Sequence, residues 1–457
     1  MKLQYLTILT FTLFTSCTQS SDEEKNPKTI APQNYFTNIS NKHAFTKEFS
    51  HLTNEEIDIW YLGRSFFKVP WITAPSITTM RDGLGPLFSA NTCINCHPNN
   101  GAGVAVKQNG EMTRSYLLRL SLKDSNDNEL LKRNGFEPDP TYGAQFSRNG
   151  SANVPSEGQA LVHYEKIEGQ YPDGTNYILR KPSYELRNLG YGALDKNTVI
   201  AGRIGSALIG LGLLENISEK DILQYEDIND KNNDGISGKA NYAFNPETNQ
   251  TQLGRFTWKA SATTVKHQSA GAAHNDMGLS NPLFPTHNCS EKQIKCIEQA
   301  NLAEHAMDLP AFRLDALSFY VSNLAVPKQR KPKKHLDGAK LFKSLNCTAC
   351  HVPEHTTSTG VKIKPYTDLL VHDMGKGLAD ERSEFLATGN EWRTAPLWGM
   401  GLYKKVSGEA NYLHDGRAKS IEEAILWHGG EAQKSKEDFM ALAKQSRNKV
   451  LEFLNSI

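Results

Sequence analysis

Two copies of one short motif constrain this chain more than any other feature. Each copy is a pair of cysteines separated by two residues and followed directly by a histidine: Cys93, Cys96 and His97 in the first, and Cys347, Cys350 and His351 in the second. Haem c uses all three residues, because the thiols bond to the porphyrin and the imidazole ligates the iron. The motifs predict two covalently bound haem c groups, with the two histidines as proximal iron ligands.

Paired cysteines also occur in zinc sites and in redox dithiols, and the sequence favours neither. The two pairs lie roughly 250 residues apart, whereas the ligands of a zinc ribbon are closely spaced. A redox dithiol is expected in a βαβ context. Neither chemistry has a use for the histidine that follows each pair.

The residues around the two motifs indicate an internal duplication. A Leu-Phe pair stands at the same offset before each motif, at 87–88 and 341–342, with an Asp-Gly pair farther upstream. Apolar residues recur at helical spacing over 309–327 and again in the last ten residues. A helix before each motif and another that closes each unit is the plan of a cytochrome c fold.

The predicted fold is therefore mainly α, with two cytochrome c-like haem domains. A chain of 457 residues is too long for one ordinary core. The first domain is expected over residues 46–327, with a large insertion of loops and short elements, and the second over residues 337–457. The basic, Pro-containing segment 328–336 is the predicted linker.

The first 17 residues have the form of a secretory signal. An early lysine precedes an apolar stretch from Tyr5 to Phe14, and small residues then lead to Cys17. This ending resembles a bacterial lipobox, which predicts lipidation of Cys17 and membrane attachment; a plain signal peptide is the alternative. Residues 18–45 are expected to form a flexible tether. The predicted location is the periplasmic or cell-envelope face of a bacterial membrane.

Two other cysteines and the overall charge complete this picture. In an oxidising compartment, Cys289 and Cys296 are expected to form a short-loop disulfide, with two unrelated buried thiols as the alternative. The formal net charge is +1. No nucleic acid partner is expected, because such a protein usually presents a basic face.

An Asp/Asn-rich segment resembles half of a calcium loop. Asp230, Asn232 and Asp234 alternate before Gly235, and short oxygen side chains in this pattern can bind Ca²⁺. Asn241 stands where an EF-hand has its glutamate, so the loop is incomplete. A tight turn is the alternative interpretation.

Longer stretches are similar to one group of bacterial enzymes. The run "EWRTAPLWGMG…YLHDGRAKSIEEAILWHGG", between residues 391 and 430, resembles the C-terminal haem domain of di-haem cytochrome c peroxidases and their methylamine-utilisation relatives. "DGLGPLFSANTCINCH", "YPDGTNYILRKPSYEL", "GRFTWKA" and "DLLVHDMGKGLAD" resemble the di-haem oxidoreductase family, sometimes labelled "thiol oxidoreductase". The resemblance covers the chain from about residue 52 to the C-terminus.

The resemblance implies a sixth ligand for the second haem. In the peroxidases a methionine that caps the iron follows the His-Asp-Gly run, and the matching position here is His428. Met374 and Met400 are the alternatives. A capping box that begins at Ser420 predicts a helix over 421–427, which would place His428 directly after its end.

The resemblance also implies a catalytic set for the first haem. The peroxidases carry a tryptophan between the haems, then a glutamine, then an acid, and Trp258, Gln268 and Asp276 follow that order. A carboxylate can move a proton between the two oxygens of a peroxide, an amide can position the peroxide, and an indole can relay electrons. The acid here is Asp instead of Glu and lies closer to the glutamine. Core packing of Trp258 and a surface turn at Asp276 are the alternative.

Together these features predict an exported di-haem c-type oxidoreductase. One haem would transfer electrons and the other would reduce a small oxidant, with hydrogen peroxide as the leading candidate. The electron donor or acceptor would be a small redox protein. The alternatives are a non-catalytic di-haem electron-transfer lipoprotein and a di-haem enzyme that oxidises a partner protein.

Overall fold

The computed structural model describes residues 31–107, 110–125, 127–151, 153–302 and 307–457. The predicted signal segment, Cys17 and the first part of the predicted tether lie outside the described residues. Among the helices that these ranges form, none is long and apolar enough to cross a membrane.

A pair of helices stands beside the first motif. α1 (Asn54–Lys68) begins at a capping box formed by Thr53 and packs along α8 (Ala311–Ser322), which confirms the helix expected near 309–327. The two helices approach closely at Gly63, where a Cβ atom would lie 1.9 Å from a backbone oxygen of α8. α2 (Cys93–Cys96) carries the first motif and contacts α1.

A second pair of helices stands beside the second motif. α9 (Leu336–Ser344) packs against α13 (Lys444–Ser456), and α11 (Ile421–Trp427) contacts α13. α11 has the predicted bounds, and the hydroxyl of Ser420 accepts the backbone N–H of Glu423. Each motif thus has one helix before it and one helix that closes its half of the chain.

The Leu-Phe pairs of the sequence repeat are not equivalent in space. The ring of Phe342, in α9, lies 6.2 Å from the ring of His351 at an angle of 45°. At the first motif this place is taken by Phe67 of α1, 6.4 Å from His97 at the same angle. The upstream pair instead forms the short strand β2 (Leu87–Phe88). A phenylalanine packs on the histidine in both sites, but it stands at a different distance before the motif in each.

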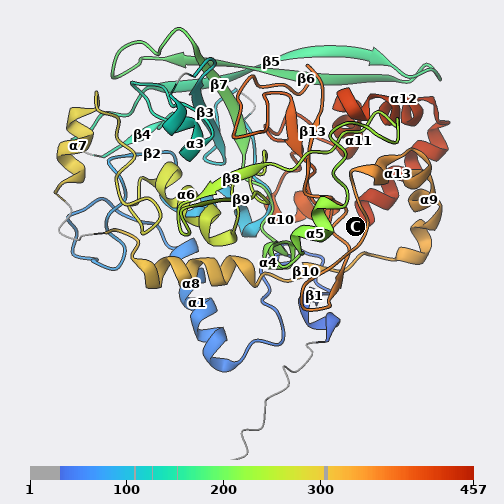
Figure 1. Cartoon of the computed structure of the whole chain (residues 1–457), viewed down its shortest axis with the longest axis horizontal. Helices are drawn as coiled ribbons and strands as arrows, with labels where there is room; N and C mark the ends of the chain where they lie inside the picture. The colour runs from blue at the N-terminus through green and yellow to red at the C-terminus, as the bar shows by residue number, and fades with distance from the viewer. Residues whose placement is uncertain (1–30, 108–109, 126, 152, 303–306) are drawn as a thin grey trace, which may run out of the picture.

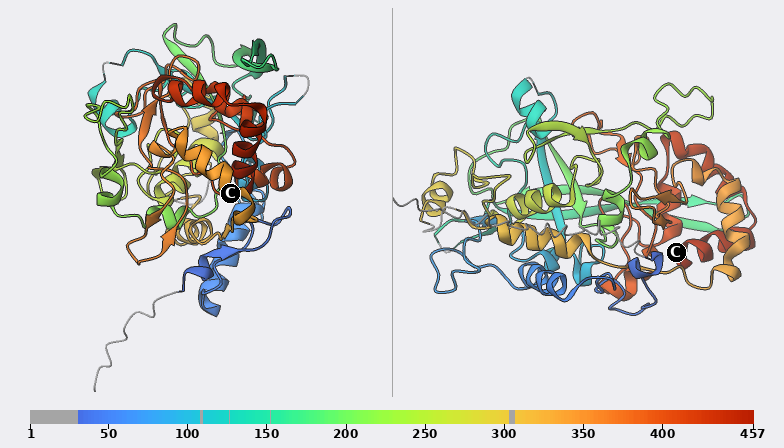
Figure 2. Two further views of the ribbon diagram at one scale, coloured as in Figure 1. Left: turned by 90° about the vertical axis from the view of Figure 1, so that its right-hand side faces the viewer. Right: turned by 60° about the horizontal axis from the view of Figure 1, so that its bottom comes forward.

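A long hairpin connects the first half of the chain to the second. β5 (Gln159–Gln170) and β6 (Asn176–Arg187) pair antiparallel and reach over the C-terminal part of the chain, drawn in orange to red (Figures 1 and 2). Side chains attach the hairpin to that part. The bonds run from the Tyr171 hydroxyl to Glu422, from Arg180 to the carbonyl of Arg417, and from Arg447 to Asp173.

The fold is mixed, so the prediction of a mainly α protein is wrong. Helices make up 31% of the chain and strands 20%. Most strand residues lie, along the sequence, between α1 and α8. They belong to β5, β6 and the antiparallel pair β3 (Tyr116–Leu122) and β7 (Thr198–Ile204). The hairpin carries many exposed residues, so its strands lack the alternation of apolar and polar residues that marks a half-buried strand.

Apart from α6 (Val265–Met277), which has 13 residues, the other elements are short. The remaining helices are α3 (Asn128–Asn134), α4 (Leu211–Glu215), α5 (Glu219–Leu223), α6 (Val265–Met277), α7 (Ile294–Ala300), α10 (Tyr403–Ser407) and α12 (Gln433–Ala441). The remaining strands are β1 (Phe36–Thr37), β4 (Asn149–Gly150), β8 (Tyr242–Asn245), β9 (Gln250–Leu253), β10 (Val326–Pro327), β11 (His355–Thr356), β12 (Lys362–Ile363), β13 (Val371–Asp373) and β14 (Glu391–Arg393).

One hydrophobic core extends through both halves of the chain, from Tyr35 to Ile457. The predicted linker 328–336 is held at its start by backbone bonds, because Lys328 donates to Thr37 and Arg330 donates to Ser456. The two motifs are therefore carried by halves that share one packed interior.

Candidate functional site

Both motifs form a tight turn that presents the histidine. The backbone N–H of His97 donates to the carbonyl of Cys93, and that of His351 to the carbonyl of Cys347, both at 3.0 Å. None of the four motif cysteines is in a disulfide. Burial raises the pKa of Cys93 and of Cys347 to about 12, so these groups remain thiols at neutral pH.

Three predicted iron ligands share one hydrogen-bonding arrangement. In each, the Nδ1–H group donates to a backbone carbonyl oxygen, which leaves Nε2 with the free lone pair. The pairs are His97 with Ser206 at 2.8 Å, His351 with Tyr366 at 3.0 Å, and His428 with Ala424 at 2.7 Å. Burial lowers the pKa of His97 and His351 to about 4 and also lowers that of His428. A neutral, oriented imidazole is the form that binds a metal.

His351 and His428 line the same cavity, which has a volume of about 240 Å³. Cys347 and Cys350 line it as well, and most other lining side chains are apolar, among them Phe342, Leu345, Leu378, Leu413, Ile425 and Phe439. Packed protein interiors leave few voids larger than a water molecule. The cavity therefore fits a large, flat, mostly apolar group, and its thiols and imidazoles fit a haem.

Two basic side chains, Arg393 and Lys436, line this cavity. Within the described part of the chain, the Arg393 guanidinium donates to the backbone carbonyls of Thr257 and Thr394 and to no other group. Among the described residues no carboxylate forms an ion pair with it, and burial lowers its pKa to about 10. The Asp368 charge opposes this shift of the Arg393 pKa, but within the described residues it forms no ion pair with the guanidinium. The guanidinium therefore fits an anionic group such as a haem propionate. Met374 and Met400, the alternatives to His428, also line the cavity.

The two motifs meet across three consecutive residues. Ser206, whose carbonyl accepts the Nδ1–H of His97, itself lines the cavity of the second motif. Gly205 lies against the His97 ring, since a Cβ atom there would be 2.7 Å from Cε1. The indole N–H of Trp258 donates to the carbonyl of Ile204 at 2.9 Å, and Trp258 also lines the cavity. Trp258 thus stands against the segment that separates the two sites.

Asp276 lies near the first motif, in the last turn of α6. Its side chain is 16% exposed and its Oδ1 is 3.4 Å from Nη2 of Arg119. Burial raises the pKa of Asp276, while Arg119 and the side-chain amide of Gln145 lower it. The Asp276 charge in turn raises the pKa of Cys93, which shows that the carboxyl and the motif are close.

Gln268 does not join this group in the structure. Its side chain forms no hydrogen bond with the residues that the structure describes, and the amide beside Asp276 is that of Gln145. Sequence reasoning missed Arg119 and Gln145 because they come from distant segments; Arg119 is 157 positions from Asp276. No local motif could have indicated this contact.

A second tryptophan near the cavity has a different environment. Trp392 stacks on His414, with ring centroids 3.6 Å apart and planes 7° apart. The Arg203 guanidinium and the Lys259 ammonium lie 4.7 Å and 3.9 Å from the centre of the Trp392 ring. Two cations against one indole oppose the removal of an electron from it. No cation lies over Trp258 among the described residues.

One more cavity histidine was not predicted. His372 lies between two carboxylates, with Nε2 2.8 Å from Asp368 and Nδ1 2.7 Å from Glu431. Burial alone would lower its pKa, but Asp368 raises it well above the ordinary value. The two carboxylates therefore favour the protonated form of His372.

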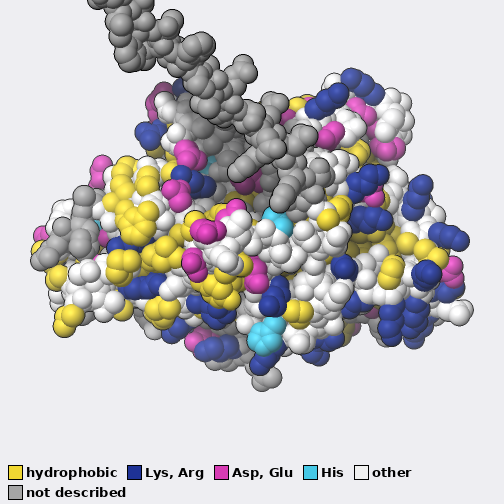
Figure 3. Space-filling model, turned by 90° about the horizontal axis from the view of Figure 1, so that it is seen from below, with side chains coloured by type: hydrophobic (Ala, Val, Ile, Leu, Met, Phe, Trp, Pro, Cys, Tyr) yellow, Lys and Arg dark blue, Asp and Glu magenta, His cyan; other side chains and the backbone are white. Residues whose placement is uncertain are grey.

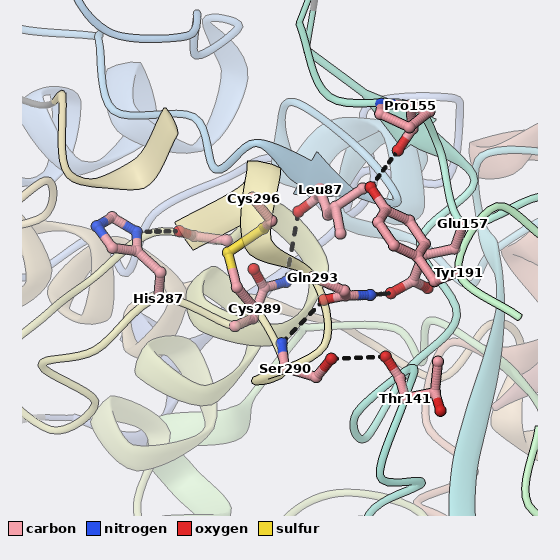
Figure 4. The surroundings of a disulfide bond; sticks show 12 residues. Leu87, Thr141, Pro155, Glu157, Tyr191, His287, Cys289, Ser290, Gln293 and Cys296 are labelled. Carbon is pink, nitrogen blue, oxygen red and sulfur yellow. Dashed lines mark hydrogen bonds between the residues drawn. A yellow bond between two sulfur atoms is a disulfide. The ribbon is translucent and has the colours of Figure 1, made fainter. Parts of the chain in front are cut away.

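Cys289 forms a disulfide with Cys296, which lies in α7 (Ile294–Ala300), with sulfurs 1.99 Å apart (Figure 4). Gln293, between them in sequence, donates to the buried carboxyl group of Glu157 (Figure 4). The backbone N–H of Ser147 donates to the other oxygen of Glu157. The disulfide loop is thus attached to the first half of the chain.

The oxygens of the calcium-like segment are used within its own turn. Asp230 accepts the backbone N–H groups of Asp234 and Gly235, and Asn232 accepts that of Asp234. Asn232 and Asp234 are exposed and Asp230 is half-buried. Calcium binding by Asp230, Asn232 and Asp234 stays a prediction.

Comparisons with known proteins differ in what they reveal. No curated protein matches this chain. Among solved structures, the hydrazine synthase of Kuenenia stuttgartiensis is similar at 15% identity and a TM-score of 0.25, over 38% of this chain and 65% of that chain. The present chain thus spans about 65% of the length of that structure. A similarity this low supports no inference about the fold or function of the present chain.

A family match covers nearly the whole chain. The family described as "Di-haem oxidoreductase, putative peroxidase" matches residues 29–457. This range includes both motifs, the cavity, Trp258 and Asp276. The chain therefore belongs to the di-haem oxidoreductase family, and haem is the cofactor that this family implies.

Proposed function

We propose that this chain is an exported c-type di-haem oxidoreductase that reduces hydrogen peroxide. The four motif cysteines would hold two haems covalently, with His97 and His351 as proximal ligands. The observation that carries the proposal is the contact between the sites: Ser206 accepts the Nδ1–H of His97 and lines the cavity that contains His351. Two cofactors separated by so short a segment can exchange electrons.

The second site would be the electron-transfer end. His351 and His428 are both neutral and both have Nδ1 fixed by a carbonyl, so two imidazoles are available in one cavity. Ligation by two histidines leaves no position for a substrate and stabilises the oxidised iron relative to ligation by histidine and methionine. His428 is therefore the proposed sixth ligand, in preference to Met374.

The first site would be the catalytic end. A haem bound there supplies the electrons and the position at which peroxide binds. Asp276 would accept a proton from one peroxide oxygen and return it to the other, so that peroxide, two electrons and two protons give two waters. Arg119, 3.4 Å from Asp276, would keep this carboxyl group oriented, and Gln145 would position the oxygen that departs as water.

Export and anchoring belong to the same proposal. Haem c attachment is typical of exported proteins, and the N-terminal sequence up to Cys17 has the form of a lipoprotein signal. We place the protein on the periplasmic or cell-envelope face of a bacterial membrane, held by its N-terminal lipid. The electron donor would be a small redox protein.

The spin states of the two ferric haems test the proposal. The purified haem-loaded protein should give an EPR spectrum with one low-spin signal, from the site of His351 and His428, and one high-spin signal, from the site of His97. Peroxide should be consumed in the presence of a reduced small cytochrome. Two low-spin haems in every redox state, without peroxide consumption, would instead indicate a non-catalytic electron-transfer protein.

A further inference from the structure

A continuous series of aromatic rings leads from His97 to the surface of α1. Ring centroids lie 6.4 Å apart between His97 and Phe67, 5.3 Å between Phe67 and Tyr320, and 4.9 Å between Tyr320 and Trp60. Trp60 is 5.2 Å from Tyr61. Tyr61 is 52% exposed, whereas Phe67, Tyr320 and Trp60 are buried.

Hydrogen bonds connect the same two ends by a second route. The hydroxyl of Tyr320 donates to Oδ1 of Asn100 at 2.9 Å, and the backbone N–H of Asn100 donates to the carbonyl of His97 at 2.9 Å. This route matters because Phe67 lies in the ring series and phenylalanine is too difficult to oxidise to hold a charge. Tyr320 is thus coupled to the first motif without Phe67.

The crossing of α1 and α8 produces this arrangement. At Gly63 the helices approach so closely that a Cβ atom would be 2.8 Å from the Cβ of Tyr320. Trp60 and Phe67, one on each side of Gly63 in sequence, can therefore both contact Tyr320. The contacts depend on a single residue without a side chain.

The environments of the rings differ in where a proton can go. A tyrosine or tryptophan that loses an electron becomes a stable neutral radical only if it also loses its proton. The Nε1 of Trp60 is buried and has no hydrogen-bond partner among the described residues. Arg64 lies 6.0 Å from the Trp60 ring and 5.9 Å from the Tyr61 ring, so its charge does not distinguish the two. Tyr320 is buried and bonded to an amide. Only Tyr61, within this series, can release a proton to water.

We propose that Tyr320, Trp60 and Tyr61 carry oxidising equivalents from the first motif to the surface, with Tyr61 as a site for one-electron oxidation of small phenols. This inference rests on the proposed peroxide reduction. After peroxide has taken two electrons and two protons and become two waters, one electron moves inward from Tyr61, whose phenolic proton goes to water. A phenol at the surface then gives one electron and one proton back to Tyr61 and leaves as a phenoxyl radical. A second phenol repeats the cycle.

The surface around Tyr61 suits such a substrate. Ile59 and Leu62, within two positions of Tyr61 in the sequence of α1, are 45% and 40% exposed. α1 lies on the lower side of the molecule in Figure 1, and on this side, seen in Figure 3, hydrophobic side chains are mixed with acidic and basic ones. A small aromatic molecule can reach the exposed phenol beside these apolar groups.

Spin trapping tests the path directly. The haem-loaded full chain is mixed with peroxide and a nitroso spin trap in the absence of a donor, and adducts are mapped by peptide mass spectrometry. The expected result is an adduct at Tyr61 that is lost in Tyr61→Phe and largely lost in Trp60→Phe and Tyr320→Phe. Added phenol should suppress the adduct in the unsubstituted protein.

Two controls separate the possible results. Tyr242, in β8, is also exposed, and Tyr242→Phe should leave the Tyr61 adduct unchanged. Circular dichroism and the ferric spectrum check that Trp60→Phe and Tyr320→Phe are folded and loaded; if either is not, Tyr61→Phe and the phenol competition decide. Peroxide consumption without a Tyr61 adduct, or equal adducts at Tyr61 and Tyr242, overturns the relay alone. Absence of peroxide consumption refutes the proposed function and the relay together.

Discussion

The indole nitrogen of Trp258 and the carbonyl oxygen of Ile204 are 2.9 Å apart, and this hydrogen bond holds the indole against the segment between the two motifs. Ile204 precedes Gly205, which contacts the His97 ring, and Trp258 lines the cavity of His351. The indole is therefore placed to couple the two sites.

Trp258→Phe should slow the redistribution of electrons between the haems. The variant removes the indole and leaves the Ile204 carbonyl without its donor, at a loss of about 1 kcal/mol of stability. Stopped-flow absorbance after half-reduction measures the rate. Trp392→Phe is the matched control, because the cations beside Trp392 make it a poor relay; equal slowing in both variants would argue against a special role for Trp258.

His428→Ala should convert the second haem from low spin to high spin, because the substitution removes the proposed sixth ligand. EPR and the ferric optical spectrum report this change. Met374→Leu keeps an apolar side chain of similar volume in the same cavity and should leave the second haem low spin. The reverse pattern would make Met374 the ligand.

The double variant Cys347→Ala/Cys350→Ala should bind one covalent haem per chain instead of two. Haem content from the pyridine haemochrome spectrum and haem staining after denaturing electrophoresis measure this ratio. Cys289→Ala/Cys296→Ala should keep both haems and lose about 2 kcal/mol of stability, because it opens a short disulfide loop. Two covalent haems in the first variant would refute thioether attachment at the second motif.

Asp276→Asn should lower the rate of peroxide turnover by about 100-fold or more, since general acid–base catalysis by a positioned group contributes roughly that factor. Burial raises the Asp276 pKa, so activity should fall as the pH drops through this raised value and the carboxylate becomes protonated. The Asn variant should lack this acidic limb.

Gln145→Leu should also reduce turnover, whereas Gln268→Leu should have a smaller effect; the opposite order would favour the glutamine expected from the sequence.

Glu157 should make the folded state less stable as the pH rises. Burial raises its pKa from 4.5 to about 8, so the native state binds more protons than the unfolded state between these values. Stability should therefore be unaffected below pH 4.5 and should decrease, by at most about 1.4 kcal/mol per pH unit, as the pH rises towards 8. Urea unfolding of Glu157→Gln should show a pH-independent offset and no such slope from this group.

Local patterns in the sequence predicted the features that depend on few neighbouring residues. Each Cys-x-x-Cys-His motif is complete within five consecutive residues. The helix predicted over 421–427 follows Ser420, whose hydroxyl accepts the backbone N–H of Glu423. The Glu423 carboxylate accepts the backbone N–H of Lys419 instead of that of Ser420, so only half of the predicted capping box forms. The disulfide joins cysteines only 7 positions apart. Such features need no knowledge of how distant segments meet.

The group around Asp276 and the amount of strand could not be obtained in this way. Arg119 reaches Asp276 across 157 positions, and a single sequence carries no record of that contact. The hairpin of β5 and β6 was missed for another reason. Its turn contains Asp173 and Gly174, a recognised hairpin signal, but its exposed strands show no hydrophobic alternation to reveal them.

That hairpin also limits how the chain can be divided. Residues 159–187 belong to the first half, yet Tyr171, Asp173 and Arg180 bond to residues near the C-terminus. A fragment that begins at residue 337 would lack the hairpin. A chimera that exchanged only residues 337–457 would pack the hairpin against side chains with which it does not form these bonds. The second haem unit is thus not a transferable module. Exchanges between relatives should succeed only when the hairpin and the C-terminal helices are taken from the same protein.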